Sequence, residues 1–196
     1  MGRLTRQFFA RDTLVVARHL LGQRLVRMLD GDRLSGRIVE VEAYVGEDDQ
    51  ASHARPGRTE RNAPMYGPPG HAYVYLIYGM HHCLNTVTER EGFPAAVLIR
   101  ALQPVEGIER MRELRSGRAD LPLTSGPARL CQALAIDRAF DGADLCAPDA
   151  LLFLEEGVPV ADEAVAQSPR IGVRGDERAM TAAWRFYLRD NRHVSR

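Results

Sequence analysis

Two glutamates and a tyrosine recur at every second position in the run Glu40-Val41-Glu42-Ala43-Tyr44. Alternate side chains of a β-strand share one face, so both carboxylates and the phenol would lie together, with the glutamates about 7 Å apart. Two carboxylates at that separation, when partly buried, differ in proton affinity, and one of them can then take a proton from water. Alternating glutamates are more often the solvated face of an antiparallel strand, and the motif alone favours that interpretation.

Tyrosines cluster in the run Tyr73-Val74-Tyr75-Leu76-Ile77-Tyr78-Gly79-Met80, which holds half of the six tyrosines of the chain. Tyrosine rings stack on nucleobases, which is worth about 1–3 kcal/mol per base, and their faces attract cations. Tyr78 comes directly before a glycine at a predicted strand end, where a side chain could enter a DNA groove as a wedge. A tyrosine-rich core strand explains the run equally well.

Three other segments carry candidate functional residues. Asn85 and Arg100 lie in or beside apolar runs, where polar side chains are usually satisfied by the backbone but could also shape a cleft. The run Ser125-Gly126-Pro127 predicts a helix start, whose free N–H groups can hold phosphate. Arg129 follows one turn later. This helix start is a weak signal for contact with a DNA backbone through Gly126 and Arg129.

Four histidines, His53, His71, His81 and His82, are candidates for a metal site. Their spacing fits none of the standard ligand patterns, and the chain has no cysteine pair to support them. We therefore expect no metal and no other cofactor. A histidine in a loop rich in glycine and proline, such as His53, could equally stack on a ligand.

The elements that position these residues follow from hydrophobic periodicity and from glycine and proline. Asp30-Gly31 is a hairpin signal, and the segment 54–70 is predicted to be an ordered, irregular loop. Helices are predicted at 13–21, 104–115 and 125–136, and strands at 22–29, from about 33, at 38–45, 71–78, 95–102, 151–154, 170–173 and 184–188. Because most strands neighbour hairpins, we expect an α+β fold: a curved, largely antiparallel sheet with helices packed around it.

Length and composition bound the remaining possibilities. With 196 residues, 45% of them hydrophobic and 27% charged, the chain predicts one globular domain over 1–196. No apolar run approaches the roughly 20 residues of a membrane span and no secretory signal opens the chain, so we expect a cytoplasmic protein, nucleoid-associated in a bacterium, without a membrane partner. Cys83, Cys131 and Cys146 are odd in number and far apart, as expected of reduced thiols.

The chain has a net charge of zero, and all of its 26 basic residues are arginine. A neutral chain has no global attraction to nucleic acid, although its cationic ends could fold onto one side. Without lysine, the chain can form no lysine Schiff base and can hold no lysine-bound pyridoxal cofactor.

Six runs taken together closely resemble the alkyladenine (3-methyladenine) DNA glycosylases. The resemblance extends in order over nearly the whole chain, so it is far more specific than any single motif. The runs are Gly-Arg-Ile-Val-Glu-Val-Glu-Ala-Tyr (36–44), Tyr-Val-Tyr-Leu-Ile-Tyr-Gly-Met (73–80), Val-Leu-Ile-Arg-Ala-Leu-Gln-Pro-Val-Glu-Gly (97–107), Ser-Gly-Pro-Ala-Arg-Leu-Cys-Gln-Ala-Leu-Ala-Ile (125–136), Arg-Ile-Gly-Val (170–173) and Arg-Phe-Tyr-Leu (185–188).

This resemblance implies a base-excision repair enzyme that flips an alkylated or deaminated purine out of duplex DNA and hydrolyses its N-glycosidic bond. Glu42 matches the general base that activates water, and Arg100 matches the arginine that positions that water. The residues that match the walls of the base pocket are Tyr44, His53 and Tyr75, while Asn85 matches the residue that rejects guanine and Tyr78 the residue that fills the gap in the duplex. The implied partner is double-stranded DNA with damaged purines, bound by a monomer without an obligate protein partner.

Three other functions stay open on the residues alone. A carbohydrate glycosidase could use Glu40 and Glu42 as its acid and base, because their spacing allows the inverting geometry. A non-enzymatic protein could bind damaged DNA through arginines on phosphates and tyrosines on bases. A metal hydrolase could use the four histidines. The absence of lysine also predicts that a glycosylase of this sequence leaves the abasic strand intact, because strand cleavage usually needs an amine nucleophile.

Overall fold

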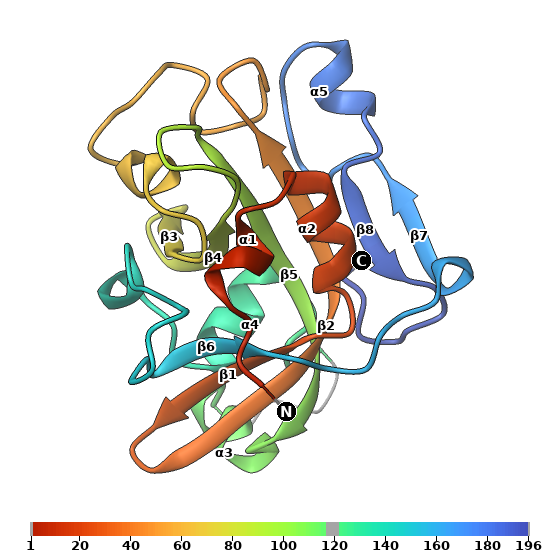
Figure 1. Cartoon of the computed structure of the whole chain (residues 1–196). Helices are drawn as coiled ribbons and strands as arrows, with labels where there is room; N and C mark the ends of the chain where they lie inside the picture. The colour runs from red at the N-terminus through yellow and green to blue at the C-terminus, as the bar shows by residue number, and fades with distance from the viewer. Residues whose placement is uncertain (1, 117–121, 196) are drawn as a thin grey trace.

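The computed structural model describes residues 2–116 and 122–195. It is built on one antiparallel sheet in the order β3-β4-β5-β2-β1-β6, with the pair β7–β8 joined to β2 through β8 (Figure 1). The strands are β1 (Arg24–Leu29), β2 (Asp32–Val45), β3 (Ala72–Ile77), β4 (His81–Val87), β5 (Ala95–Glu106), β6 (Leu152–Glu155), β7 (Val165–Ser168) and β8 (Arg185–Leu188). The expected α+β class with a largely antiparallel sheet is confirmed.

The helices are short and lie around the sheet (Figure 1). They are α1 (Arg6–Phe9), α2 (Thr13–Leu20), α3 (Ile108–Leu114), α4 (Pro127–Ala133) and α5 (Glu177–Thr181), with 3₁₀ turns η1 (Ala63–Tyr66), η2 (Arg138–Phe140) and η3 (Asp162–Ala164). Helix α2 begins where the sequence predicts, because the Asp12 carboxylate accepts hydrogen bonds from the backbone N–H groups of Leu14 and Val15. No helix among the described residues is long and apolar enough to cross a membrane.

The long strands β2 and β5 form the spine of the fold and run side by side (Figure 1). The turn before β2 is confirmed: Asp30 and Gly31 both adopt positive φ, as a tight hairpin turn demands. Alternate residues of the spine serve two purposes. Val41 and Ile99 are fully buried in the main hydrophobic core together with Leu20 of α2, whereas the residues between them carry the polar chemistry described below.

Two predicted elements differ from the structure, and one observed strand was not predicted. The segment 104–106 continues β5, and the helix starts only at Ile108, because Pro104 and Glu106 pair with β2 and Gly107 then turns the chain with φ of 70°. The segment 170–173 is a bend, with Gly172 at φ of 71°, and the strand lies earlier, at β7. Strand β4 has no counterpart among the predicted strands, since its polar Asn85 and Thr86 are buried in the sheet and break the expected alternation.

Candidate active site

A row of side chains from four strands meets on one face of the sheet. The register pairs Glu42 with Leu98, Leu98 with Asn85, and Asn85 with Tyr73. Directly opposite residues of antiparallel strands project to the same face, so these four positions form a line across the sheet. The next positions along the strands, which include Tyr44, Arg100 and Tyr75, extend the line into a surface.

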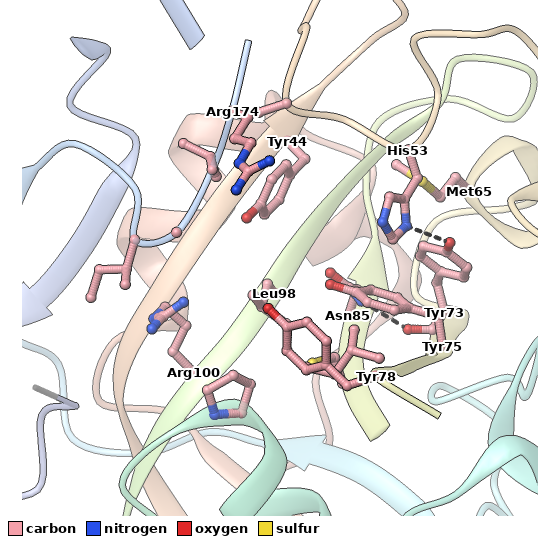
Figure 2. Close-up of a pocket in the computed structure, with 17 residues that line it drawn as sticks. Tyr44, His53, Met65, Tyr73, Tyr75, Tyr78, Asn85, Leu98, Arg100 and Arg174 are labelled. Atoms are coloured by element: carbon pink, nitrogen blue, oxygen red, sulfur yellow. Dashed lines mark hydrogen bonds between the residues drawn. The ribbon is translucent and has the colours of Figure 1, made fainter. Parts of the chain in front are cut away.

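This surface lines a cavity of about 410 Å³. Aromatic rings from three segments face one another across it, with Arg100 at one end and Arg174 near Tyr44 (Figure 2). Its volume is typical of a pocket that holds a small organic group. The lining residues are Tyr44, Ala51, His53, Met65, Tyr73, Tyr75, Ile77, Tyr78, Cys83, Asn85, Leu98, Arg100, Pro127, Ile171, Gly172, Val173 and Arg174.

Glu42 is fully buried directly behind this lining. Its Oε2 accepts a hydrogen bond from the Tyr44 hydroxyl at 2.9 Å and lies 3.2 Å from Nη1 of Arg100, while its Oε1 accepts from the backbone N–H of Ile171 at 2.7 Å. All three partners line the cavity. The interpretation of the alternating glutamates as a solvated face is therefore wrong: Glu40 is fully buried as well.

The charged and polar groups around Glu42 stabilise one another, as the pKa values of its neighbours show. Burial opposes the charge of Arg100, but Glu42 and Glu40 outweigh it, so the pKa of Arg100 lies above its usual value. Burial, and then the charge of Glu42, raises the pKa of Tyr44 well above its usual value. Tyr44 therefore keeps its proton and donates to the Glu42 carboxylate, which has partners on both oxygens.

The aromatic wall of the cavity is neutral. His53 lies edge-on to Tyr75 with ring centroids 4.4 Å apart, and its Nδ1 lies 2.8 Å from the Tyr73 hydroxyl (Figure 2). Burial, and then the charge of Arg61, lowers the pKa of His53, so the ring stays uncharged at neutral pH. Burial also raises the pKa of Tyr75, and it raises that of Tyr73 to about 12. Such a wall favours a cationic guest over a neutral one through the faces of its rings.

Asn85 and Tyr78 lie at opposite extremes of exposure. The Asn85 amide is buried at the cavity floor, where its Nδ2 donates to the Tyr73 carbonyl at 3.0 Å (Figure 2). Tyr78 also lines the cavity, but 88% of it is exposed, and φ of 51° places it at the tip of the β3–β4 hairpin. A large aromatic side chain held outside the core at a cavity mouth is placed to meet something other than this chain.

The sequence profile of the family described as Methylpurine-DNA glycosylase (MPG) matches residues 7–192. A relative from Methanocella arvoryzae, named as a candidate 3-methyladenine DNA glycosylase, is 53% identical over 194 residues, covering 98% of this chain and 96% of the relative. Relatives with the same name from Carboxydothermus hydrogenoformans and Myxococcus xanthus are 49% and 48% identical, covering 98% and 100% of this chain and 98% and 95% of theirs. The chain belongs to the methylpurine-DNA glycosylase family.

Membership in the methylpurine-DNA glycosylase family confirms the resemblance drawn from the six sequence runs. The protein is a DNA glycosylase, an enzyme of DNA repair that hydrolyses N-glycosidic bonds. A protein that only binds damaged DNA, a carbohydrate glycosidase and a metal hydrolase are thereby set aside. Among the described residues, no group of three or more histidine, cysteine or acidic side chains is placed to hold a metal ion. His71 instead contacts Arg6, its Nδ1 lying 3.1 Å from Nη1 of the arginine.

Sequence reasoning missed the segment of this glycosylase that holds Glu42 from the far side. Arg170 forms a fully buried ion pair with Asp49, at 2.6 Å and 2.8 Å, and donates to the carbonyls of Ala43 and Ala179. This pair fixes the bend that presents the N–H of Ile171 to Glu42. The run at 170–173 that resembles the family, the acidic run at 47–49 and the arginine-rich end of the chain were the signals, and they could not show which residues would pair.

The predicted backbone-binding residues Gly126 and Arg129 do not line the glycosylase cavity themselves. Pro127, the first residue of α4, lines the cavity directly after Gly126. Arg129 is exposed and donates from Nη1 to the Ser125 carbonyl at 2.9 Å. A second hollow of about 460 Å³ shares Ala51, His53 and Arg174 with the cavity, and Arg55 and Arg61 also line it.

Proposed function

We propose that this glycosylase flips an alkylated or deaminated purine out of duplex DNA into the cavity and hydrolyses its N-glycosidic bond with water activated by Glu42. One observation carries the proposal: the buried Glu42 carboxylate touches three residues that line a 410 Å³ cavity with aromatic walls. A base inside a duplex is out of reach of such a carboxylate, so it has to leave the stack before reaction.

The neutral aromatic wall selects the damaged base. A purine alkylated on a ring nitrogen carries a positive charge, which the faces of Tyr44 and Tyr75 attract and a protonated histidine would repel. The lowered pKa of His53 keeps that ring uncharged. Asn85, fixed at the floor by its bond to the Tyr73 carbonyl, crowds the position where guanine carries an exocyclic amine.

The chemical step needs one proton acceptor and little acid. For a purine alkylated on a ring nitrogen, the bond between C1′ and the base nitrogen breaks, and its electron pair neutralises the cationic base. A water oxygen forms the new bond to C1′ while its proton passes to Glu42, whose negative charge also stabilises the sugar cation in the transition state. Arg100 orients the water beside Glu42, with Nη1 held 3.2 Å from Oε2.

The rim of the cavity holds the DNA. Arg55, Arg61 and Arg174 form a cationic hollow next to His53, which suits the phosphates that flank an extruded nucleotide. Gly126 and Arg129 lie at the start of α4, whose first residue Pro127 lines the cavity, and add a weaker contact to the DNA backbone. Base flipping then places the sugar between these two groups, next to Glu42.

Tyr78 fills the gap that the extruded purine leaves in the duplex. We expect Tyr78→Ala to weaken binding to a lesion duplex by about 1–3 kcal/mol, roughly 5- to 150-fold, because one stacked aromatic ring is lost. The melting temperature should not change, since 88% of Tyr78 is exposed. Binding to single- and double-stranded DNA, measured by fluorescence anisotropy, checks this.

The matched control is Val158→Ala, a truncation of an apolar residue that is 62% exposed and does not line the cavity. It should bind both forms of DNA as the unmodified enzyme does. The wedge role also requires that Tyr78→Ala spare single-stranded DNA, which has no gap to fill. Equal losses on both forms would contradict it.

The enzyme leaves an intact abasic strand. Its sequence has no lysine, so no side chain offers the primary amine that a strand-cleaving glycosylase uses to attack C1′. After incubation with borohydride we expect no covalent adduct between protein and DNA on a denaturing gel, and strand breaks only after alkali. A borohydride-trapped adduct would show an amine nucleophile and overturn this part of the proposal.

Duplexes that each carry one defined lesion test the proposed function as a whole. Incubation with the enzyme should release a methylated purine as free base, detected by chromatography, and leave an alkali-labile site at the same position. Release from an undamaged duplex at the same rate, or tight lesion binding without any release, would contradict the proposal.

A further inference from the structure

Glu40 is buried beside the site, yet its carboxylate has a different environment from that of Glu42. Its Oε1 accepts from Nε of Arg100 at 3.0 Å, from Nε of Arg185 at 2.7 Å and from Oγ of Ser195 at 2.9 Å, and its Oε2 accepts from the backbone N–H of Ser195 at 2.7 Å. Of these three partner residues Arg100 lines the cavity and Arg185 and Ser195 do not, whereas all three partners of Glu42 line it. A carboxylate that accepts this many hydrogen bonds is held in one position and orients its neighbours.

We propose that Glu40 is a positioning residue that, together with Ser195, fixes the plane of the Arg100 guanidinium group. This inference rests on the proposed role of Glu42. Arg100 is held along one edge, because Nε contacts Glu40 and Nη2 donates to Oγ of Ser195 at 3.3 Å. A guanidinium group is planar, so fixing these two nitrogens also fixes Nη1, which faces Oε2 of Glu42 at 3.2 Å.

The charges alternate along this network. Arg185, Glu40, Arg100 and Glu42 follow one another in contact, and each side chain is nearly or fully buried. Glu40 and Glu42 both attract the Arg100 guanidinium group, and the attraction from Glu40 balances that from Glu42. Without Glu40, Arg100 would be drawn toward Glu42, where it would compete with the attacking water for the carboxylate oxygens.

The last described residues, Val194 and Ser195, complete this network although they lie far from Glu40 and Arg100 in the sequence. After β8 the chain returns to the face of β2 and β5, where the Val194 carbonyl accepts from Oγ of Ser125 at 3.2 Å. Ser195 then reaches both Glu40 and Arg100. The water-positioning arginine is thus set only when this end segment is in place.

Single-turnover base release and DNA binding of three variants test the proposal. We expect Glu40→Gln to slow base release about 10- to 100-fold, since small displacements of positioning groups cost up to about 100-fold. Ser195→Ala, which keeps the backbone bond to Glu40, should slow release about 3- to 10-fold, and Ser195→Thr should restore most of that rate. Affinity for lesion DNA should stay within about twofold, because neither residue meets the DNA.

The control variant is Glu155→Gln, which breaks a short but more exposed ion pair with Arg33, at 2.6 Å, that lies outside the cavity lining. It should release base at the unmodified rate per folded molecule. A residue that acts only through Arg100 and Glu42 has little further effect once Glu42 is disabled. Adding Glu40→Gln to Glu42→Gln should therefore change the residual rate, corrected for uncatalysed release, by less than about twofold.

Two results would overturn the inference: an unchanged rate in both Glu40→Gln and Ser195→Ala, or the full effect of Glu40→Gln persisting in the Glu42→Gln background. If Glu40→Gln does not fold, Ser195→Ala alone decides, and an unchanged rate then overturns the inference. Failure of the proposed function is a separate outcome, because it appears as a normal rate in Glu42→Gln alone.

Discussion

Replacing Glu42 by glutamine should lower the single-turnover rate of base release about 10²- to 10⁴-fold, the usual contribution of a general base. Glutamine keeps the shape of the side chain: its one amide oxygen can accept from the N–H of Ile171 while its NH2 group donates to the Tyr44 hydroxyl, so the cavity should persist. It cannot take a proton from water or stabilise the sugar cation with a negative charge. Rapid-quench measurement of released base checks the rate.

Lesion binding is the control for this variant. The affinity of Glu42→Gln for a lesion duplex should match that of the unmodified enzyme, because Glu42 lies behind the cavity lining. A loss of binding in parallel with the loss of rate would indicate a collapsed pocket instead. Turnover at the normal rate would remove Glu42 from the chemistry altogether.

Replacing Asp49 by alanine should lower the free energy of unfolding by about 3–5 kcal/mol, because the variant leaves Arg170 buried without its counter-charge. Both side chains of this pair are fully buried, and their two contacts are 2.6 Å and 2.8 Å long. No solvent therefore screens the charge of Arg170 once Asp49 is removed. For a domain of this size the melting temperature should fall by roughly 6–20 °C. Thermal unfolding followed by circular dichroism measures it.

The surface pair of Arg18 and Asp162 is the matched control. Its carboxylate is 97% exposed although the contact is equally short, at 2.6 Å. We expect Asp162→Ala to cost at most about 1 kcal/mol. If Asp49→Ala costs no more than Asp162→Ala, the buried pair does not stabilise the bend at 170–173. At temperatures where Asp49→Ala remains folded, its base release should still fall, because Ile171 no longer presents its N–H to Glu42.

The sequence predicts the central strands β2 and β5 well and the segment 170–173 poorly. Local signals determine two elements. The carboxylate of Asp12 caps the start of α2. Asp30 and Gly31 adopt the positive φ that the hairpin turn requires. The helix predicted from Pro104 failed for the opposite reason. Its helical periodicity competes with a ladder that β2 imposes from far away in sequence, and the ladder extends to Glu106.

The site shows the same division between local and distant causes. Alternation places Glu40, Glu42 and Tyr44 on one face, but it cannot tell a solvated face from a buried one. That depends on Arg100 from β5, Arg185 from β8 and the segment around Ile171, all brought in by tertiary structure. The resemblance to a family supplied the roles of Glu42, Tyr44 and Arg100, whereas their contacts come from the structure alone.

A crystal structure of the Glu42→Gln variant with a duplex that carries one methylated purine would test the central claim most directly. We expect the purine between Tyr44, His53 and Tyr75, the ring of Tyr78 in the gap of the duplex, and C1′ within one bridging water of the substituted side chain, about 5–6 Å away. A damaged base that remains stacked in the helix, or that occupies a different hollow with the side chain at position 42 out of reach, would contradict the account.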